Sequence, residues 1–276
     1  MSPLITANQL EELLKSSANV LICDCRFDLH QTSAGREAYA AGHIPGAIYI
    51  DLDNDLSDTK TGTNGRHPLP TPANWAKTRQ RLGIESQTHV ITYDSQGSVY
   101  ASRLWWMLRA IGHSKVQVLD GGLDSWKGAI SKVKRVPTAL HMQVKPCGYE
   151  GLVLVDEVVN NLASRNKTVL DARAPDRFHG QNETLDPVGG HIPGAINRFF
   201  KDNLVTGEFK SPETLRSEFS ELLGNRKAQD VIHQCGSGVT ACHNLLAMEN
   251  AGLSGSVLYA GSWSEWCADP MRPVEV

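Results

Sequence analysis

The chain has 276 residues, of which 41% are hydrophobic and 21% are charged, and its formal net charge is −3. This composition predicts a globular protein with a buried core, and the weak charge gives no reason to expect a nucleic acid or a membrane surface as partner. The six cysteines are too few for a disulfide scaffold and are not spaced as paired zinc ligands, so we expect reduced thiols, no metal site and no cofactor. With no apolar leader at the start and no apolar run of about 20 residues, the expected location is the cytoplasm.

Short runs rich in β-branched residues alternate with stretches of helical periodicity. In chain order the first half predicts a helix at 7–15, strands at 20–24 and 47–50, a helix at 72–82, a strand at 89–94, a helix at 98–111 and a strand at 116–120. Alternation of this kind is typical of βα units, so we predict an α/β fold with a small parallel sheet covered by helices on both faces. Ligands of such folds bind at the carboxyl ends of the strands.

The chain repeats itself once. The segment G-H-I-P-G-A-I occurs at 42–48 and again at 190–196, and an apolar run ending in Asp-x-Arg precedes each copy, closing at Arg26 and at Arg173. A repeat of this length indicates two copies of one domain rather than a solenoid unit. Because both copies keep the histidine of the segment, we expect it to be structural and to bond a backbone group. The predicted arrangement is a first domain at 1–134, a linker at 135–148 and a second domain at 149–276.

The two halves differ at the end of one strand. Aligning V-I-T-Y-D at 90–94 with V-I-H-Q-C at 231–235 places Asp94 opposite Cys235. One half therefore carries a carboxylate where the other carries a thiol. This difference indicates that thiol chemistry belongs to the second half.

Cys235 opens the loop C-G-S-G-V-T, which leads into a helical stretch that ends at Gly252. Gly236 and Gly238 can adopt positive φ and turn backbone N–H groups inward. These groups, with the first turn of the helix, would surround the sulfur and favour its thiolate form. The alternative is a buried, inert cysteine, which is what we expect of Cys242 within the helix.

The tandem domains, the two G-H-I-P-G-A segments, the C-G-S-G-V-T loop and the closing G-S-W-S-E-W at 261–266 resemble two-domain sulfurtransferases, the rhodanese family, over nearly the whole chain. The loop is similar to that of mercaptopyruvate sulfurtransferases, whereas thiosulfate enzymes usually carry basic residues inside it. The resemblance implies a sulfurtransferase that moves sulfur from 3-mercaptopyruvate, through a Cys235 persulfide, to cyanide, a small thiol or a protein thiol. The N–H groups that would hold the outer sulfur belong to Gly236, Gly238, Val239 and Thr240.

The resemblance also implies residues that act on the leaving pyruvate enolate. By motif match these are Ser237 in the loop, His67 in G-R-H-P-L-P and Asp53 in D-L-D-N-D, with Asp51 as an alternative to Asp53. Ser237 would be polarised by His67, which Asp53 would orient, as in hydrolase triads. His67 and Asp53 lie in the first half, so the expected site draws on both domains.

Two arginines of the family hold the donor carboxylate, because a forked donor suits a planar anion. One matches Arg177 in A-P-D-R-F, but no arginine stands between Gly180 and His191, where the second is expected. Arg198 and Arg66 are the candidates to replace it.

The sequence bears on three other functions. Thiosulfate as the donor would need a cation close to the sulfur, which the loop itself does not supply. A cysteine phosphatase would need an arginine at the position of Ala241, so the sequence argues strongly against this class. A persulfide carrier that hands sulfur to a protein partner without turning over small donors stays open.

Overall fold

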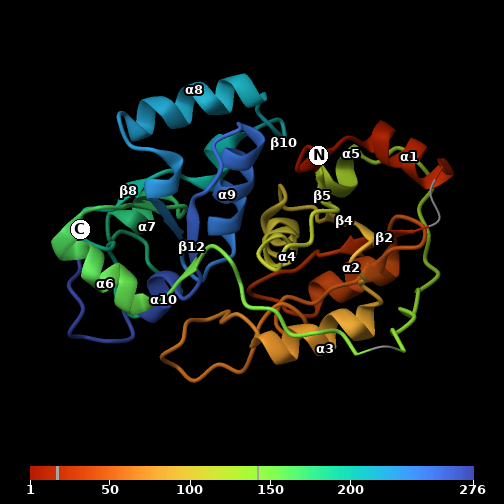
Figure 1. Ribbon diagram of the computed structural model, residues 1–276, viewed down its shortest axis with the longest axis horizontal. Helices are drawn as coiled ribbons and strands as arrows, with labels where there is room; N and C mark the ends of the chain where they lie inside the picture. The colour runs from red at the N-terminus through yellow and green to blue at the C-terminus, as the bar shows by residue number, and fades with distance from the viewer. Residues whose placement is uncertain (17–18, 142) are drawn as a thin grey trace. The chain divides into compact units, whose positions relative to one another are not determined.

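The computed structural model describes residues 1–16, 19–141 and 143–276, and the chain forms two compact units (Figure 1). Unit 1 comprises Met1–Asp58 and Leu69–Glu150, and unit 2 comprises Thr59–Pro68 and Gly151–Val276. A short segment from the first half of the sequence is thus part of the unit that the second half builds. The domain limits expected from the sequence, 1–134 and 149–276, stay a prediction. In the structure the expected linker, 135–148, packs with unit 1, where Arg135 Nη1 donates to the Gly46 carbonyl at 2.9 Å.

Unit 1 contains a parallel sheet with the strand order β1-β5-β4-β2-β3. Its strands are β1 (Leu4–Ile5), β2 (Val20–Asp24), β3 (Ile48–Tyr49), β4 (His89–Tyr93) and β5 (Val116–Leu119). Its helices are α1 (Ala7–Ser16), α2 (Ala34–Ala41), α3 (Pro72–Leu82), α4 (Val99–Arg109) and α5 (Gly122–Ser125).

Helices cover both faces of this sheet, as predicted. On one face, Ile22 and Ile91 pack in a cluster with Leu10 of α1 and Tyr39 of α2. On the other face, the Thr92 hydroxyl donates to the carbonyl of Ala101 in α4 at 3.1 Å. Because side chains alternate along a strand, neighbouring residues of β4 serve the two different cores.

Unit 2 repeats this topology, with a parallel sheet in the order β6-β12-β11-β7-β8. Its strands are β6 (Leu152–Val153), β7 (Thr168–Asp171), β8 (Ile196–Asn197), β11 (Val231–Gln234) and β12 (Val257–Tyr259), beside a small antiparallel pair of β9 (Leu204–Val205) and β10 (Glu208–Phe209). Its helices are α6 (Val155–Ser164), α7 (Pro175–Phe178), α8 (Pro212–Leu223), α9 (Thr240–Asn250) and α10 (Ser262–Trp266), with short 3-10 turns η1 (Phe200–Asn203) and η2 (Ala228–Asp230). Among the described residues of both units, no helix combines the length and apolar character needed to cross a membrane.

The repeated sequence motif builds the same contacts in each unit. In unit 1 the Arg26 guanidinium donates to both carboxylate oxygens of Asp24 and to the carbonyl of Gly42. In unit 2 Arg173 does the same with Asp171 and with the carbonyl of the glycine before the second histidine. The Asp-x-Arg pair at the end of one strand thereby fixes the turn that enters the next, so its role is architectural.

The two histidines of the repeat are also structural, as expected. His43 Nδ1 lies 2.7 Å from the Tyr39 carbonyl and His191 Nδ1 lies 2.9 Å from the Phe178 carbonyl. Each imidazole stacks on the ring of that same partner, with centroids 4.0 Å and 3.8 Å apart. Imidazole and carbonyl therefore satisfy each other in both cores.

Asp94, at the end of β4, occupies the position where the second half carries its thiol. One carboxylate oxygen accepts hydrogen bonds from the N–H groups of Gln96 and Ser98 at 2.9 and 2.8 Å, and the other accepts from Tyr100 and Ala101 at 2.8 and 3.0 Å. The side chain is fully buried. The loop between β4 and α4 and the first turn of α4 thus direct their N–H groups at one buried carboxylate, and these hydrogen bonds oppose the rise in its pKa that burial causes.

Replacing Asp94 with alanine should lower the free energy of unfolding by about 3 kcal/mol or more, because each buried N–H without an acceptor costs about 1–3 kcal/mol. Asp94→Asn should cost less, since its carbonyl oxygen still accepts. Urea denaturation of both variants measures the difference. Asp124→Ala, at an exposed position of α5, is the control, and an Asp94→Ala variant equally stable would contradict the account.

Candidate functional site

The site is built around the Cys235 loop, residues 235–239, which connects β11 to α9. Gly238 adopts a φ of 75° in this loop. A β-carbon at this position would lie 2.3 Å from the carbonyl oxygen of Ala260, so a larger residue would not fit. The tight turn therefore depends on glycine and brings the N-terminus of α9 close to the end of β11.

Cys235 is held by its main chain and its sulfur faces the loop. Its N–H donates to the Ser262 hydroxyl at 3.1 Å, and its carbonyl accepts from the Trp263 N–H at 3.0 Å. The Gly238 N–H donates to Cys235 Sγ at 3.1 Å. The residue is 2% exposed, so the sulfur lies at the floor of the loop and not on the open surface.

The other predicted loop residues lie beside this contact. Gly236 follows the cysteine, Val239 is the N-cap of α9, and Thr240 is its first residue. Among the described hydrogen bonds, the backbone N–H group that donates to Cys235 Sγ is that of Gly238. Cys242 is fully buried and its thiol donates to the Gly238 carbonyl at 3.3 Å, as expected for a core thiol.

Ser237 and His67 lie together, as the motif match predicts. His67 Nδ1 is 2.8 Å from Ser237 Oγ, and both residues are buried. The segment that carries His67 is held at the loop by two further features. The Arg66 N–H donates to the Ser264 hydroxyl at 3.0 Å, and a β-carbon on Gly65 would lie 2.8 Å from the Gly261 carbonyl oxygen. The imidazole thus belongs to unit 2, although the sequence places it in the first half.

Asp53 belongs to unit 1. It lies in the turn after β3, where its N–H donates to the Asp51 carboxylate at 3.0 Å. Asp51 also accepts from the Asn54 N–H and pairs with Arg36 at 3.1 Å. Asp51 therefore stabilises its own turn, and the role of Asp53 in orienting His67 stays a prediction.

Arg177 lies in α7, and a β-carbon built on Gly236 of the Cys235 loop would lie 3.6 Å from its Nη2, while its role in holding the donor carboxylate stays a prediction. Its Nε and Nη2 form a fork with the Glu183 carboxylate at 3.0 and 2.9 Å. Although burial raises the pKa of Glu183, hydrogen bonds from the Leu185 N–H and from Arg177 bring it below its usual value. Glu183 was not anticipated, and the signal for it was the acidic character of the segment that lacks the expected arginine.

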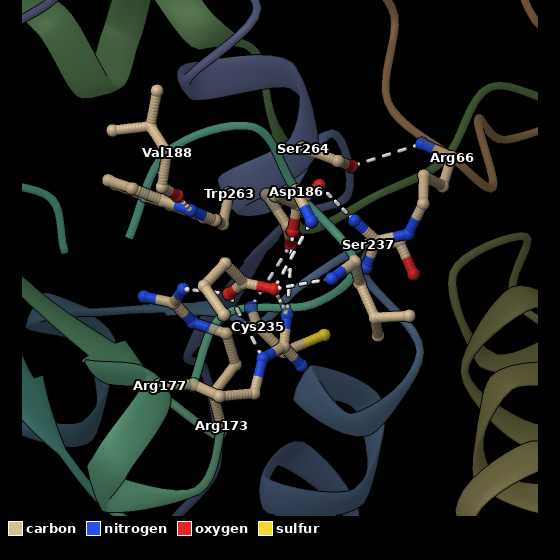
Figure 2. Close-up of polar contacts among 12 residues, drawn as sticks. Arg66, Arg173, Arg177, Asp186, Val188, Cys235, Ser237, Trp263 and Ser264 are labelled. Carbon is tan, nitrogen blue, oxygen red and sulfur yellow. Dashed lines mark hydrogen bonds and ion pairs between the residues drawn. The ribbon is translucent and has the colours of Figure 1, made fainter. Parts of the chain in front are cut away.

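Of the two candidates for the missing arginine, Arg66 lies at the site and Arg198 does not. Arg66 pairs with Asp186, a second acid that sequence reasoning missed (Figure 2). Arg198 instead donates to Glu218 at 2.5 Å and to Asn203 at 3.0 Å. The described part of unit 2 therefore combines a thiol, a hydroxyl–imidazole pair and two guanidinium groups around one loop. This set can attack a sulfur atom, stabilise an oxyanion and hold an anionic ligand.

A family model described as Rhodanese-like domain matches residues 6–129 and 154–269. The chain is 44% identical over 280 residues to a probable 3-mercaptopyruvate sulfurtransferase of Pseudomonas aeruginosa, covering 98% of this chain and 97% of the relative. It is 37% identical to a putative thiosulfate sulfurtransferase, SseB, of Mycobacterium tuberculosis, covering 98% of this chain and 96% of the relative.

Solved structures agree with these sequence relationships. SseA from Escherichia coli, one of the 3-mercaptopyruvate sulfotransferases, superposes with a TM-score of 0.81 at 30% identity, covering 95% of this chain and 99% of SseA. The 3-mercaptopyruvate sulfurtransferase from Leishmania major superposes with a TM-score of 0.83 at 31% identity, covering 95% of this chain and 74% of that protein. The duplicated fold and the two matched segments lead to the same conclusion: the chain belongs to the rhodanese family of two-domain sulfurtransferases.

Proposed function

We propose that this protein transfers sulfur from 3-mercaptopyruvate to a thiol or cyanide acceptor, with Cys235 as the nucleophile. The observation that carries the proposal is the 2.8 Å contact between His67 Nδ1 and Ser237 Oγ, two residues from the thiol. A hydroxyl polarised by an imidazole suits a donor whose leaving group is an enolate. It would do little for a donor that releases sulfite.

In the proposed first half-reaction, the Cys235 thiolate attacks the sulfur of 3-mercaptopyruvate. A sulfur–sulfur bond forms, the carbon–sulfur bond breaks, and its electron pair leaves on the pyruvate enolate. Ser237 donates a hydrogen bond to the enolate oxygen, supported by His67, and the methylene carbon takes up one proton to give pyruvate, which balances the proton that the donor thiol releases as the outer sulfur ionises. The enzyme is left as a Cys235 persulfide, whose outer sulfur lies at the Gly238 N–H.

In the second half-reaction an acceptor thiolate or cyanide attacks the outer sulfur. The sulfur–sulfur bond breaks and its electron pair returns to Cys235 as thiolate. Cyanide becomes thiocyanate, and a thiol becomes a persulfide. The proposed thiol acceptors are small thiols and a reducing protein that carries a thiol. The free state of all six cysteines supports the cytoplasm as the location.

Thiosulfate is the second candidate donor, and one contact favours it. The Arg66 guanidinium approaches Gly236 closely enough that a β-carbon there would lie 2.7 Å from Nη2. A cation supplied by a different segment would serve the function of the basic loop residues that the Cys235 loop lacks.

Replacing Cys235 with serine should abolish thiocyanate formation with either donor, because the nucleophile is lost. Cys242→Ser should keep most of the activity, since this thiol donates to a backbone carbonyl. Mass spectrometry after exposure to donor alone should show one added sulfur on the wild type and none on Cys235→Ser. A persulfide without turnover of small donors would favour the carrier function instead.

Ser237→Ala should lower kcat with 3-mercaptopyruvate by about 10²-fold, the usual cost of removing one oxyanion donor. With thiosulfate the loss should be much smaller, because no enolate forms. Steady-state kinetics with cyanide and each donor measure both effects, and the wild type should show the higher kcat/KM with 3-mercaptopyruvate. Equal losses with the two donors, or a higher wild-type kcat/KM with thiosulfate, would contradict the donor assignment.

A further inference from the structure

Two arginines from different segments meet beside the residue that follows the nucleophile. A β-carbon built on Gly236 would lie 2.7 Å from Arg66 Nη2 and 3.6 Å from Arg177 Nη2. Both guanidinium groups therefore face the backbone next to Cys235, and Figure 2 shows them on opposite sides of the same cluster of polar contacts. A carboxylate bound between them would lie one residue away from the sulfur.

That place is taken by the protein's own carboxylate. Asp186 Oδ1 forms an ion pair with Arg66 Nη1, and Asp186 Oδ2 lies 3.4 Å from Arg177 Nη2. The Asp186 side chain is 3% exposed, whereas the side chains of Arg66 and Arg177 are 26% and 20% exposed. The aspartate is thus enclosed by the groups that would bind an anionic ligand.

Glu183 and Asp186, the two acids between Gly180 and His191, differ in the number and length of their hydrogen bonds to the protein. Glu183 makes a fork with Arg177 at 2.9 and 3.0 Å and also accepts from the N–H groups of Leu185 and Asp186. Asp186 makes a longer contact with Arg177, and burial raises its pKa although Arg66 opposes this shift. The ionised form of Asp186 is therefore less favoured in its place than that of Glu183, and Asp186 is easier to displace.

We infer that Asp186 is an internal competitor of the sulfur donor: it occupies the place between Arg66 and Arg177 where the donor carboxylate would bind, until the donor displaces it. The ligand class is a short 2-oxo acid that carries its sulfur close to its carboxylate, since the arginines lie at Gly236, the residue next to the thiol. Asp186 then acts as an internal competitor that raises the KM of the donor without taking part in the transfer. This inference rests on the proposed sulfur transfer at Cys235.

The test is the variant Asp186→Asn, which removes the charge and keeps the size of the side chain. If the free site is populated only about a tenth of the time, removing the competitor should lower the KM for 3-mercaptopyruvate by about tenfold and leave kcat within about twofold. Glu221→Gln, at an exposed position of α8, changes the net charge equally and should leave both parameters unchanged. A KM that rises or stays constant in Asp186→Asn would show that the aspartate only positions the arginines, and would overturn the inference.

A binding measurement that needs no sulfur transfer tests this inference separately from the proposed choice of donor. Pyruvate should protect Cys235 from alkylation by iodoacetamide, and a lower pyruvate concentration should suffice in Asp186→Asn, whereas acetone, which has no carboxylate, should not protect. If thiosulfate proves the better donor yet the pyruvate shift is seen, the preference for 3-mercaptopyruvate fails, whereas the competition between Asp186 and an anionic ligand stands. If 3-mercaptopyruvate is preferred and no shift is seen, the inference alone fails.

A second variant keeps the test valid if Asp186→Asn does not fold. Arg66→Gln should raise the protecting pyruvate concentration and the KM for 3-mercaptopyruvate by about tenfold, because one of two charge-assisted contacts is lost. Unchanged values in Arg66→Gln would assign the carboxylate to Arg177 alone and overturn the inference.

Discussion

The structure depends on one constraint, which is that a tight loop after a central strand directs backbone N–H groups at a single atom or group. In unit 1 that group is the Asp94 carboxylate, which accepts from two N–H groups of its own loop and two of the first turn of α4. In unit 2 it is Cys235 Sγ, which accepts from the Gly238 N–H. A carboxylate fills such a loop permanently, whereas a sulfur atom can gain and lose a second sulfur. The two loops occupy the same place in the two sheets, and the exchange of a carboxylate for a thiol is what would make the second one reactive under the proposed function.

The surroundings of the thiol show how a chain can satisfy one chemical requirement with residues from different places. The segment where the family carries its second arginine holds acids here, and Arg66 from Thr59–Pro68 lies at the loop instead. Arg66 pairs with Asp186 and Arg177 pairs with Glu183, so these four charges balance one another without a ligand. The affinity for an anionic donor is then a difference between two carboxylates competing for the same guanidinium groups and not the full strength of one contact.

Much of the fold could be predicted from the sequence because its signals are local. The strand at 20–24 and the helix at 72–82 have the predicted limits, since β-branched runs and helical periodicity are contained in the segments themselves. The two-residue strand β1 and the helix α2 were missed, because one is too short and the other too rich in alanine and glycine to show a pattern. The contact of Ser237 with His67 was predicted by motif match, not by periodicity.

Other features of the site leave no local trace in the sequence. The pairing of Arg66 with Asp186 joins residues far apart in the chain, and no spacing rule indicates it. Arg198 was an equal candidate by sequence, and only its tertiary contact with Glu218 removes it from the site. The assignment of Thr59–Pro68 to unit 2 is likewise a property of packing, because this segment has the polar composition of any loop.

The path of the chain through Thr59–Pro68 limits which truncated forms of the protein would keep the complete site. The polypeptide leaves unit 1 after Asp58, supplies unit 2 with His67 and Arg66, and returns to unit 1 at Leu69. A fragment starting at Gly151 would keep the thiol and its sheet but would lack the imidazole beside Ser237. Truncation of the first half would therefore remove a residue that packs at the Cys235 loop, and the two copies, although alike in topology, are not interchangeable.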